Sequence, residues 1–489
     1  MKKLISILTA AAVLLLTLAS CGGENPAPGP GKKTTTAKAS GEQNTLKLAY
    51  SKNDSLNPTL CETIINSQIA NLVFDGLYKL DSSYKPVELV AKSAVVGSSM
   101  VTVTINDFRF SDGSFVSTGD IITSFNMAKS SAVFSGRLEN FTAVHTGSEN
   151  SLVFDLERAD PYALSCLDFP IIKNGSDFDY PVGCGRYAYK RDGDNIYLVV
   201  NPYRSDFNPI FRTVNLEAVH DSDSFESSLV IGNTSFCYNE LNSGDYTRIN
   251  ANNVDMGINN IVYLGFNMND SFFSNPLVRR AVSLAIDREK IVSSAFRSHA
   301  RVCATPFNPD WYAVSEISPD RIRSVEKAKE LIEKSGIEPA TREVTILFSS
   351  ENVFKSEAAE IIADSLEEIG FYVRMKAYEP QAYLYDVNSV AFDMYIGEVK
   401  LNRNMDLTPL FTGEASRGIF ETDAALLRYN EFLSGGCELI DFINTFNDDI
   451  PFAPLCYRNA VVSYTKSMHG DFRCCDADVF YDIDTWSIK

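Results

Sequence analysis

Histidine is scarce in this chain of 489 residues, which contains only His145, His220, His299 and His469. No two of them are close in sequence, although histidine is a common general base and metal ligand near neutral pH. The sequence also lacks an H-E-x-x-H motif, a G-x-S-x-G motif and a P-loop. We therefore expect no enzymatic activity, no metal site and no bound cofactor.

Basic residues are also few, with 44 Lys and Arg against 63 Asp and Glu, which gives a formal net charge of −19 at pH 7. A surface of this charge repels nucleic acid and anionic lipid, so we expect no nucleic-acid partner. Long apolar runs are rare. The run Leu4–Leu18 is shorter than the about 20 residues that a membrane-spanning helix needs.

The N-terminus has the pattern of an export signal, in which Lys2 and Lys3 precede the apolar run and small residues precede Cys21. We expect residues 1–20 to be a cleaved signal peptide. The segment Leu18-Ala19-Ser20-Cys21 resembles a bacterial lipobox, which implies a palmitate-bearing lipid anchor on Cys21. The protein is then held on the extracytoplasmic face of the cell membrane. The alternative is an ordinary secretory signal with an incidental cysteine.

Residues 21–44 follow, and they are rich in Pro, Gly, Thr and Ala with no aliphatic side chain larger than alanine. Because such a segment cannot form a core, we expect a flexible tether. Nine further cysteines show no C-x-x-C spacing, and we favour small buried thiols over a disulfide framework. They are Cys61, Cys166, Cys184, Cys237, Cys303, Cys437, Cys456, Cys474 and Cys475.

Near the middle of the chain, the apolar run Ile261–Phe266 predicts a buried strand. Asn275 and Pro276 then predict the start of a helix. Its apolar residues recur at helical spacing, and we expect the opposite face to be exposed. That face carries Arg279, Arg280, Asp287, Arg288 and Lys290.

The later part of the chain alternates strands and helices, which favours a parallel sheet covered by helices. Helices are predicted over Val325–Ser335, ending at Gly336, and over Ser356–Ile369. Strands are predicted over Glu343–Phe348, Phe371–Met375 and Ala391–Val399. Earlier, the patterns predict a helix over Ile64–Leu77, a strand over Val101–Ile105 and a helix capped by Thr118.

Several motifs together resemble the family 5 extracellular solute-binding proteins, the peptide and nickel group of ABC-importer receptors. The motif YLGFN at Tyr263–Asn267, followed by P-x-VR-x-A and AID, is similar to the mid-chain crossover of that family. The segments SLNPTLCETIINSQIANLVFDGLYKLD and FRFSDGSFVSTGD resemble its N-terminal elements. The segment PVGCGRY is also similar, although Cys184 and Arg186 depart from the family pattern.

This resemblance implies an α/β protein with the two-lobed periplasmic-binding-protein type II fold and an extra subdomain in the first lobe. We expect 45–75, 182–262 and 456–489 to form the core of the first lobe. Residues 76–181 form the extra subdomain, and 263–455 form the second lobe. The two lobes are expected to open and close about hinges near Val262–Asn267 and Ala453–Tyr457.

The resemblance also implies a function, in which a monomeric receptor captures a small solute, by default an oligopeptide, in a cleft between the lobes. It then delivers the solute to the permease subunits of an ABC importer. A sensor of the same fold that signals to a membrane partner stays open, and so does a secreted hydrolase. A nickel or haem receptor is disfavoured by the few histidines, and an adhesin by the lack of repeats.

The segment Gly397–Asp406 is the main candidate for ligand binding, because it follows a strand at the position where open α/β sheets bind ligands. In peptide-binding members, this strand end pairs with the ligand backbone, and an aspartate shortly after it holds the amino terminus. Here Glu398 replaces the usual aromatic residue, and Lys400-Leu401-Asn402 stands where the aspartate is expected.

Three interpretations of this departure stay open: Glu398 binds a cationic group, Lys400 or Arg403 binds an anionic one, or these charges line a solvated loop. Tyr162, Trp311 and Tyr312 are candidate aromatic walls of the cleft. The predicted ligand-binding residues are Glu62, Thr63, Gly397, Glu398, Val399, Lys400, Asn404, Asp406 and Tyr457.

Overall fold

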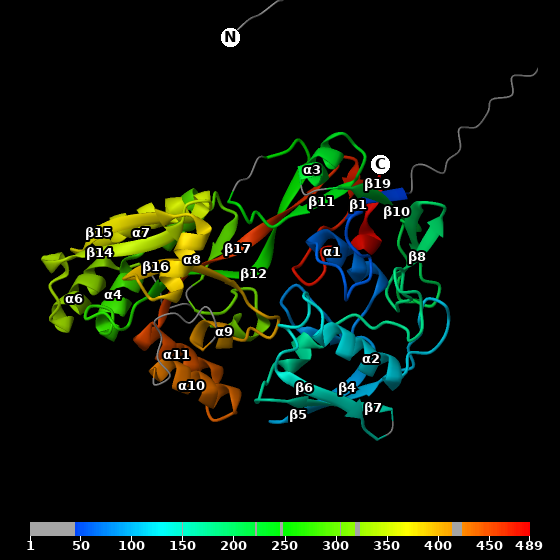
Figure 1. Ribbon diagram of the computed structural model, residues 1–489, viewed down its shortest axis with the longest axis horizontal. Helices are drawn as coiled ribbons and strands as arrows, with labels where there is room; N and C mark the ends of the chain where they lie inside the picture. The colour runs from blue at the N-terminus through cyan, green and yellow to red at the C-terminus, as the bar shows by residue number, and fades with distance from the viewer. Residues whose placement is uncertain are drawn as a thin grey trace, which may run out of the picture. The chain divides into compact units, whose positions relative to one another are not determined.

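The computed structural model describes residues 45–148, 150–220, 223–244, 248–303, 305–317, 323–412 and 423–489 (Figure 1). The predicted signal peptide, Cys21 and the tether lie outside these ranges. Within them, no helix is both long enough and apolar enough to cross a bilayer.

One sheet passes through both lobes, in the order β15-β14-β16-β12-β17-β11-β1-β10-β9-β8, with β13 paired to β17. Its two longest strands, β12 (Asn252–Phe266) and β17 (Phe452–Tyr464), pair antiparallel along their length. The others are β15 (Tyr372–Tyr378), β14 (Glu343–Ser349), β16 (Met394–Lys400), β11 (Phe236–Asn239), β1 (Thr45–Ser51), β10 (Thr213–Val219), β9 (Asn195–Val200), β8 (Tyr187–Asp192) and β13 (Ala300–Val302).

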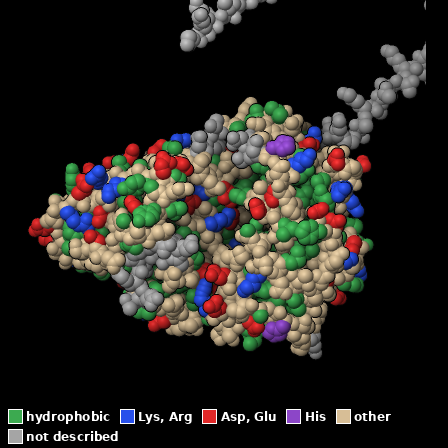
Figure 2. All heavy atoms as spheres, in the orientation of Figure 1, with side chains coloured by type: hydrophobic (Ala, Val, Ile, Leu, Met, Phe, Trp, Pro, Cys, Tyr) green, Lys and Arg blue, Asp and Glu red, His purple; other side chains and the backbone are tan. Residues whose placement is uncertain are grey.

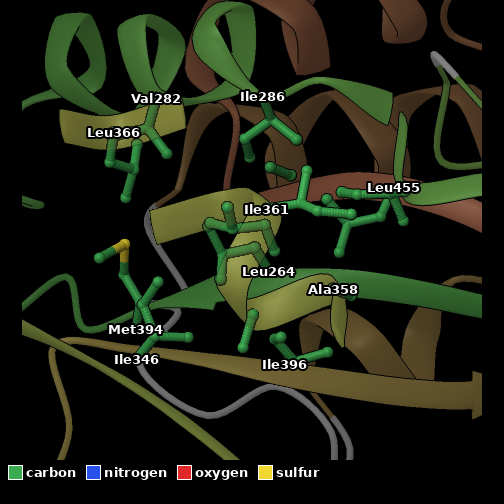
Figure 3. Packing of buried hydrophobic residues seen from close by; sticks show 14 of the residues in the cluster. Leu264, Val282, Ile286, Ile346, Ala358, Ile361, Leu366, Met394, Ile396 and Leu455 are labelled. Atoms are coloured by element: carbon green, nitrogen blue, oxygen red, sulfur yellow. The ribbon is translucent and has the colours of Figure 1, made fainter. Parts of the chain in front are cut away.

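In the second lobe, alternate residues of each strand enter different cores, because successive side chains of a strand point to opposite faces. Leu264, Ile346 and Ile396 lie in one core, where Figure 3 shows them beneath helix residues such as Val282 and Ile361. That core includes α4 (Pro276–Ala285), α6 (Val325–Ser335) and α7 (Val353–Glu367). The core of the opposite face includes α8 (Pro380–Asn388), α9 (Thr408–Phe411), α10 (Ala424–Leu433) and α11 (Leu439–Asp449).

These elements confirm the predicted alternation of strands and helices in the second lobe. β14 is parallel to both β15 and β16, as a sheet with helical crossovers requires. The helix α6 has the predicted bounds and ends at Gly336, whose φ of 71° is the left-handed conformation that glycine adopts readily. The helix α7 begins three residues earlier than predicted, because Asn352 accepts a hydrogen bond from the Lys355 amide and caps it.

In the first lobe, β1 lies between β10 and β11 and is parallel to both, and its apolar face packs on α1 (Ile64–Val73). The helix α1 ends four residues before the predicted Leu77, because the backbone becomes extended at Phe74. The last part of the chain completes this core with Phe480 and Trp486. Smaller elements are β2 (Tyr78–Leu80), β3 (Pro86–Glu88), α3 (Asp223–Val230), β18 (Met468–His469), η6 (Ile483–Thr485) and β19 (Ser487–Ile488).

The extra subdomain contains a separate antiparallel sheet, in the order β4-β5-β7-β6, and helix α2 packs on it around its own core. The predicted strand over Val101–Ile105 is β5, but the cap of α2 is Ser117 rather than Thr118. Ser117 and Asp120 form a reciprocal capping box there. The elements are β4 (Ala91–Val96), β5 (Met100–Ile105), α2 (Thr118–Lys129), β6 (Phe141–Thr146), β7 (Ser151–Leu156) and η2 (Ala163–Cys166).

The crossover helix differs from the prediction in length and in burial. Asn275 caps α4 as expected, but the helix ends at Ala285 and gives way to α5 (Arg288–Lys290) and η3 (Ile291–Ala295). The prediction that Arg279 and Arg288 are exposed is wrong, since they are only 3% and 5% exposed.

The two arginines are buried because main-chain oxygens around the start of β17 accept their hydrogen bonds. Arg279 Nε donates to the Ile450 carbonyl at 3.0 Å, and its guanidinium pairs with Asp449 at 2.6 Å. Arg288 Nε donates to the Pro454 carbonyl at 2.7 Å. A buried guanidinium is tolerated when its donors are satisfied in this way. The remaining short helices are η4 (Tyr312–Val314) and η5 (Pro339–Thr341).

Within the described ranges no cysteine forms a disulfide bond, and seven of the nine are buried. Burial raises the pKa of Cys61, Cys237 and Cys475 to about 12 in each case. These thiols therefore stay protonated at neutral pH, and the thiolate is the reactive form.

Glycine and tyrosine face each other twice across β12 and β16. Gly397 lies opposite Tyr263, and Gly265 lies opposite Tyr395. The rings cover the glycines so closely that a Cβ on Gly397 would lie 2.4 Å from Cζ of Tyr263. Gly397, one of the predicted ligand-binding residues, is thus required by the packing of the sheet.

We predict that Gly397→Ala lowers the free energy of unfolding by about 1–3 kcal/mol, because the added methyl displaces the buried Tyr263 ring. Urea-induced unfolding of the mature chain measures this change. Gly136→Ala is the matched control, since a Cβ at Gly136 meets nothing within 4 Å. Equal stability of the two variants would contradict the prediction.

Candidate functional site

The end of β16 contacts the first lobe through Lys400, one of the predicted ligand-binding residues. Its Nζ lies 2.9 Å from Glu240 Oε1 and 3.4 Å from Asp476 Oδ1. Both acids are buried residues of the first lobe. Burial lowers the pKa of Lys400, but Asp476 and Glu240 outweigh it, so the pKa is raised overall. Lys400 is therefore a charged link between the lobes.

The next residues contact the extra subdomain. Asn402 Nδ2 donates to the Gly136 carbonyl at 3.0 Å, and Asn404 Nδ2 donates to Asp160 Oδ2 at 2.7 Å. Asp406 forms an ion pair with Arg158 and accepts hydrogen bonds from Thr408 and Tyr429. The side chains of Asn404 and Asp406 are thus engaged within the protein, and their role in ligand binding stays a prediction.

Asp160 is a buried carboxyl at this contact. Burial raises its pKa to about 6, although the hydrogen bonds from Asn404 and from the Tyr162 amide oppose that shift. The contact between the extra subdomain and the second lobe therefore contains a group that takes up a proton near pH 6.

Glu398 lies where β12, β16 and β17 meet, and two cations already neutralise it. Its carboxylate lies 2.8 Å from Lys355 Nζ and 2.6 Å from Arg458 Nε, and it accepts a hydrogen bond from Asn260 Nδ2 at 2.9 Å. Burial alone would raise the pKa of Glu398, but Lys355 and Arg458 outweigh it and lower the pKa to about 2. Arg458 also donates to the Glu240 and Leu241 carbonyls, which ties β17 to the first lobe.

The other predicted ligand-binding residues lie apart from this cluster. Tyr457 is fully buried, and its hydroxyl donates to the Pro306 carbonyl at 2.8 Å. Val399 packs at the edge of the second core of the second lobe. Glu62 is exposed, Thr63 is half-buried, and their backbone amides donate to Asp54.

Two adjoining cavities lie where the two lobes and the extra subdomain meet, with volumes of about 50 Å³ and 40 Å³. Figure 2 shows a hollow near the centre of the visible face, with Lys and Arg side chains inside it. Arg403 lines both cavities from the predicted second lobe, Asp168 from the extra subdomain, Asn71 from α1 and Phe74 from the residue that follows α1.

Sequence reasoning identified Arg403 as a candidate for an anionic group but did not predict its partners. Arg137 and Asp168 belong to the extra subdomain, more than 200 residues earlier in the chain, and no motif marks them. Arg186 also lines the first cavity, where it pairs with Asp478 at 2.6 Å. Arg186 departs from the family pattern at its position, and this departure is the signal in the sequence that could have identified it.

Tyr162 and Trp311, two of the predicted aromatic walls, do not line these two cavities, and a further, larger cavity shares no lining residue with them. Tyr162 and Trp311 pack edge to face, 4.6 Å apart, beside a cavity of only about 10 Å³. A cavity of about 480 Å³ is lined entirely by residues in 50–56, 179–196 and 218, so it does not involve the second lobe. Among the described residues, no group of three His, Cys, Asp or Glu is suited to hold a metal ion.

Comparison with known proteins gives this geometry a context. Residues 85–412 match the model of the bacterial extracellular solute-binding proteins, family 5. The chain belongs to that family. Its members are solute-binding proteins of ABC importers rather than enzymes, and they act outside the cytoplasm.

Relatives in sequence include the oligopeptide-binding protein AppA of Bacillus subtilis, which is 22% identical over 443 residues, 80% of this chain and 79% of AppA. The dipeptide-binding protein DppE of the same organism is 25% identical over 414 residues, 73% of this chain and 74% of DppE.

The solved structure of the periplasmic murein tripeptide-binding protein MppA, in an unliganded open form, has a TM-score of 0.77 and 17% identity. The match covers 91% of this family 5 chain and 98% of MppA. The predicted two-lobed periplasmic-binding-protein type II fold is confirmed.

We predict that Glu398 makes stability depend on acid pH. Its folded pKa of about 2 lies below the roughly 4.3 of an unfolded glutamate, so its contribution is present above pH 4.3 and is lost as the pH falls toward 2. Glu398→Gln should lower the free energy of unfolding at pH 7 by on the order of 3 kcal/mol, and the deficit should vanish near pH 2.

Urea unfolding between pH 7 and pH 2 measures this difference. Glu343→Gln is the control, because Glu343 is exposed and pairs only with the exposed Arg374 at 3.6 Å. A deficit in Glu398→Gln that stays constant with pH would rule out the proposed role of its charge.

Proposed function

We propose that this protein captures an oligopeptide between its two lobes and delivers it to an ABC importer. The observation that carries the proposal is the junction at the end of β16, where residues of both lobes and of the extra subdomain line two cavities. Family membership supports it, and so do the relatives named for oligopeptide, dipeptide and murein tripeptide binding.

We propose a hinge in the paired segments Val262–Asn267 and Ala453–Tyr457. The chain passes between the predicted lobes only here, where Tyr263 faces Pro454 and Leu264 faces Ala453. The register between β12 and β17 shifts between Val262 and Tyr263. Such an irregularity locally disrupts the ladder of hydrogen bonds and suits a bend. A ligand that contacts both lobes favours the closed state by its difference in affinity for the two states.

We also propose that the mature chain begins at a lipid-modified Cys21 and reaches the first lobe through the tether over residues 21–44. The lipobox-like sequence before Cys21 supports this proposal. A single acyl chain binds membranes only marginally, whereas two or more anchor a protein stably, and a diacylglycerol provides at least two. The receptor is then held near the permease on the extracytoplasmic face of the cell membrane.

We predict that a peptide ligand raises the melting temperature of the mature chain and makes it more compact. Thermal unfolding in the presence of each member of a library of di- to pentapeptides identifies the ligand. A ligand at a free concentration of a hundred times its Kd stabilises the folded protein by about 2.7 kcal/mol. Small-angle scattering then compares the free and bound forms. A true ligand that leaves the radius of gyration unchanged would contradict closure, and sugars or metals as the sole stabilising compounds would contradict peptide capture.

We predict that Cys21→Ser releases the full-length protein from the membrane. Cells expressing either form are labelled with palmitate and fractionated, and the wild type should incorporate the label and sediment with membranes. The variant should do neither, because serine has no thiol to receive the diacylglycerol. Cys437→Ser is the control for the loss of a thiol, and label in the Cys21 variant would refute the anchor.

A further inference from the structure

Two arginines share one carboxylate at the junction of the cavities. Arg137 lies 2.7 Å from one oxygen of Asp168, and Arg403 lies 3.0 Å from the other. All three side chains are largely buried, with exposed fractions of 15%, 13% and 10% for Arg137, Arg403 and Asp168. One negative charge therefore stands between two positive charges that belong to different parts of the chain.

The guanidinium of Arg403 has unused hydrogen-bond donors. Arginine carries five N–H donors, yet the only polar contact of this side chain with the described residues is its ion pair with Asp168. The Arg137 guanidinium likewise donates only to Asp168, and it lies over the Phe134 ring at 5.1 Å. Arg403 lines both cavities and Arg137 lines the second, so donors that Asp168 leaves unpaired can bind an acceptor on a molecule held there.

The cavity walls are more basic than the rest of the chain. Five cations and three acids line the two cavities, whereas acids outnumber cations in the whole chain by 63 to 44. Two further acids lie near these residues: Asp206 contacts Arg204, and Asp476 contacts Lys400 and also interacts electrostatically with Arg403 and Arg137. The lining residues are Lys79, Arg137, Arg186, Arg204 and Arg403 with Asp75, Asp168 and Asp478.

Two further observations concern polar groups at these cavities. The hydroxyl of Tyr78, a residue only 3% exposed that lines the first cavity, has no hydrogen-bond partner. Burial and the neighbouring Arg403 lower the pKa of Arg137, whereas burial of Arg403 is outweighed by Asp168 and Asp476, which raise its pKa.

We infer that Arg403 and Arg137 bind a carboxylate of the captured solute, so that the receptor selects ligands with an anionic end. The inference rests on the proposed capture of a peptide and deepens it. Guanidinium and carboxylate match in shape and form strong charge-assisted hydrogen bonds.

The cavities fix how much of the ligand enters. A water molecule needs about 10–15 Å³, so volumes of 50 Å³ and 40 Å³ hold only a few waters each. A carboxylate fits such a volume, but a whole peptide does not. The inference therefore places the carboxyl end of a peptide in the cavities and its remaining residues outside them.

Calorimetric titration of the mature protein tests this selection with three probe sets. The first is a tripeptide mixture without Asp or Glu that has free carboxyl termini, the second is the same mixture with C-terminal amides, and the third is a set of non-peptide mono- and dicarboxylic acids. Loss of the charge-assisted bonds should weaken binding about tenfold or more. We therefore expect the wild type to bind the free acids at least about tenfold more tightly than the amides.

Variants assign this preference to the cavity. Arg403→Gln should reduce the preference for acids to near unity, while the exposed Arg374→Gln should keep it. Arg403→Lys keeps the positive charge but loses the planar guanidinium with its paired donors, so it should show an intermediate preference for acids. It replaces Arg403→Gln in this test if that variant does not fold. An unchanged preference in these Arg403 variants would overturn the assignment.

The probe sets separate this inference from the proposed function. Equal binding of acids and amides would overturn the inference while peptide capture stands. Binding of the non-peptide acids alone, lost in Arg403→Gln, would support the inference and overturn peptide capture. No binding of any probe would overturn both.

Discussion

The antiparallel pairing of β12 with β17 is the constraint on which the rest of this structure depends. These two strands belong to the first lobe at one end and to the second lobe at the other, so they alone carry one sheet across both. Two buried arginines stabilise these strands. Arg288 donates a hydrogen bond to the Pro454 carbonyl of β17, and Arg458 of β17 donates one to the Glu240 carbonyl. The pairing of β16 with β12 positions the candidate site at the end of β16.

Local patterns were sufficient for most of the fold. The helix α6, the strand β14 and the cap at Asn275 depend on residues close in sequence, and their predictions were confirmed. Burial of Arg279 was not predictable, because its acceptors come from residues about 170 positions later. A charged residue on a helix is expected to be solvated unless a distant segment supplies its partners, and a single sequence does not reveal that segment.

The candidate site also combines features that local sequence predicts with features that depend on distant segments. Strand-end position and family motifs pointed to the segment Gly397–Asp406, in which Lys400 pairs with Glu240 and Arg403 pairs with Asp168. Its electrostatic partners come from three separate stretches, such as Glu240, Asp168 and Asp476, that no local pattern links. The charges of Glu398 and Lys400 were visible in the sequence, but not that each is neutralised by another part of the chain.

The buried free thiols have a consequence for how this receptor survives outside the cytoplasm. While the chain is folded, packing shields most of its sulfur atoms from oxidants, and their raised pKa keeps them unreactive. Once the chain unfolds, nine thiols become accessible together and can cross-link in wrong combinations within or between molecules. In air and without a reductant, such cross-links trap the unfolded chain, so the lifetime of the receptor then depends on how slowly it unfolds rather than on its equilibrium stability.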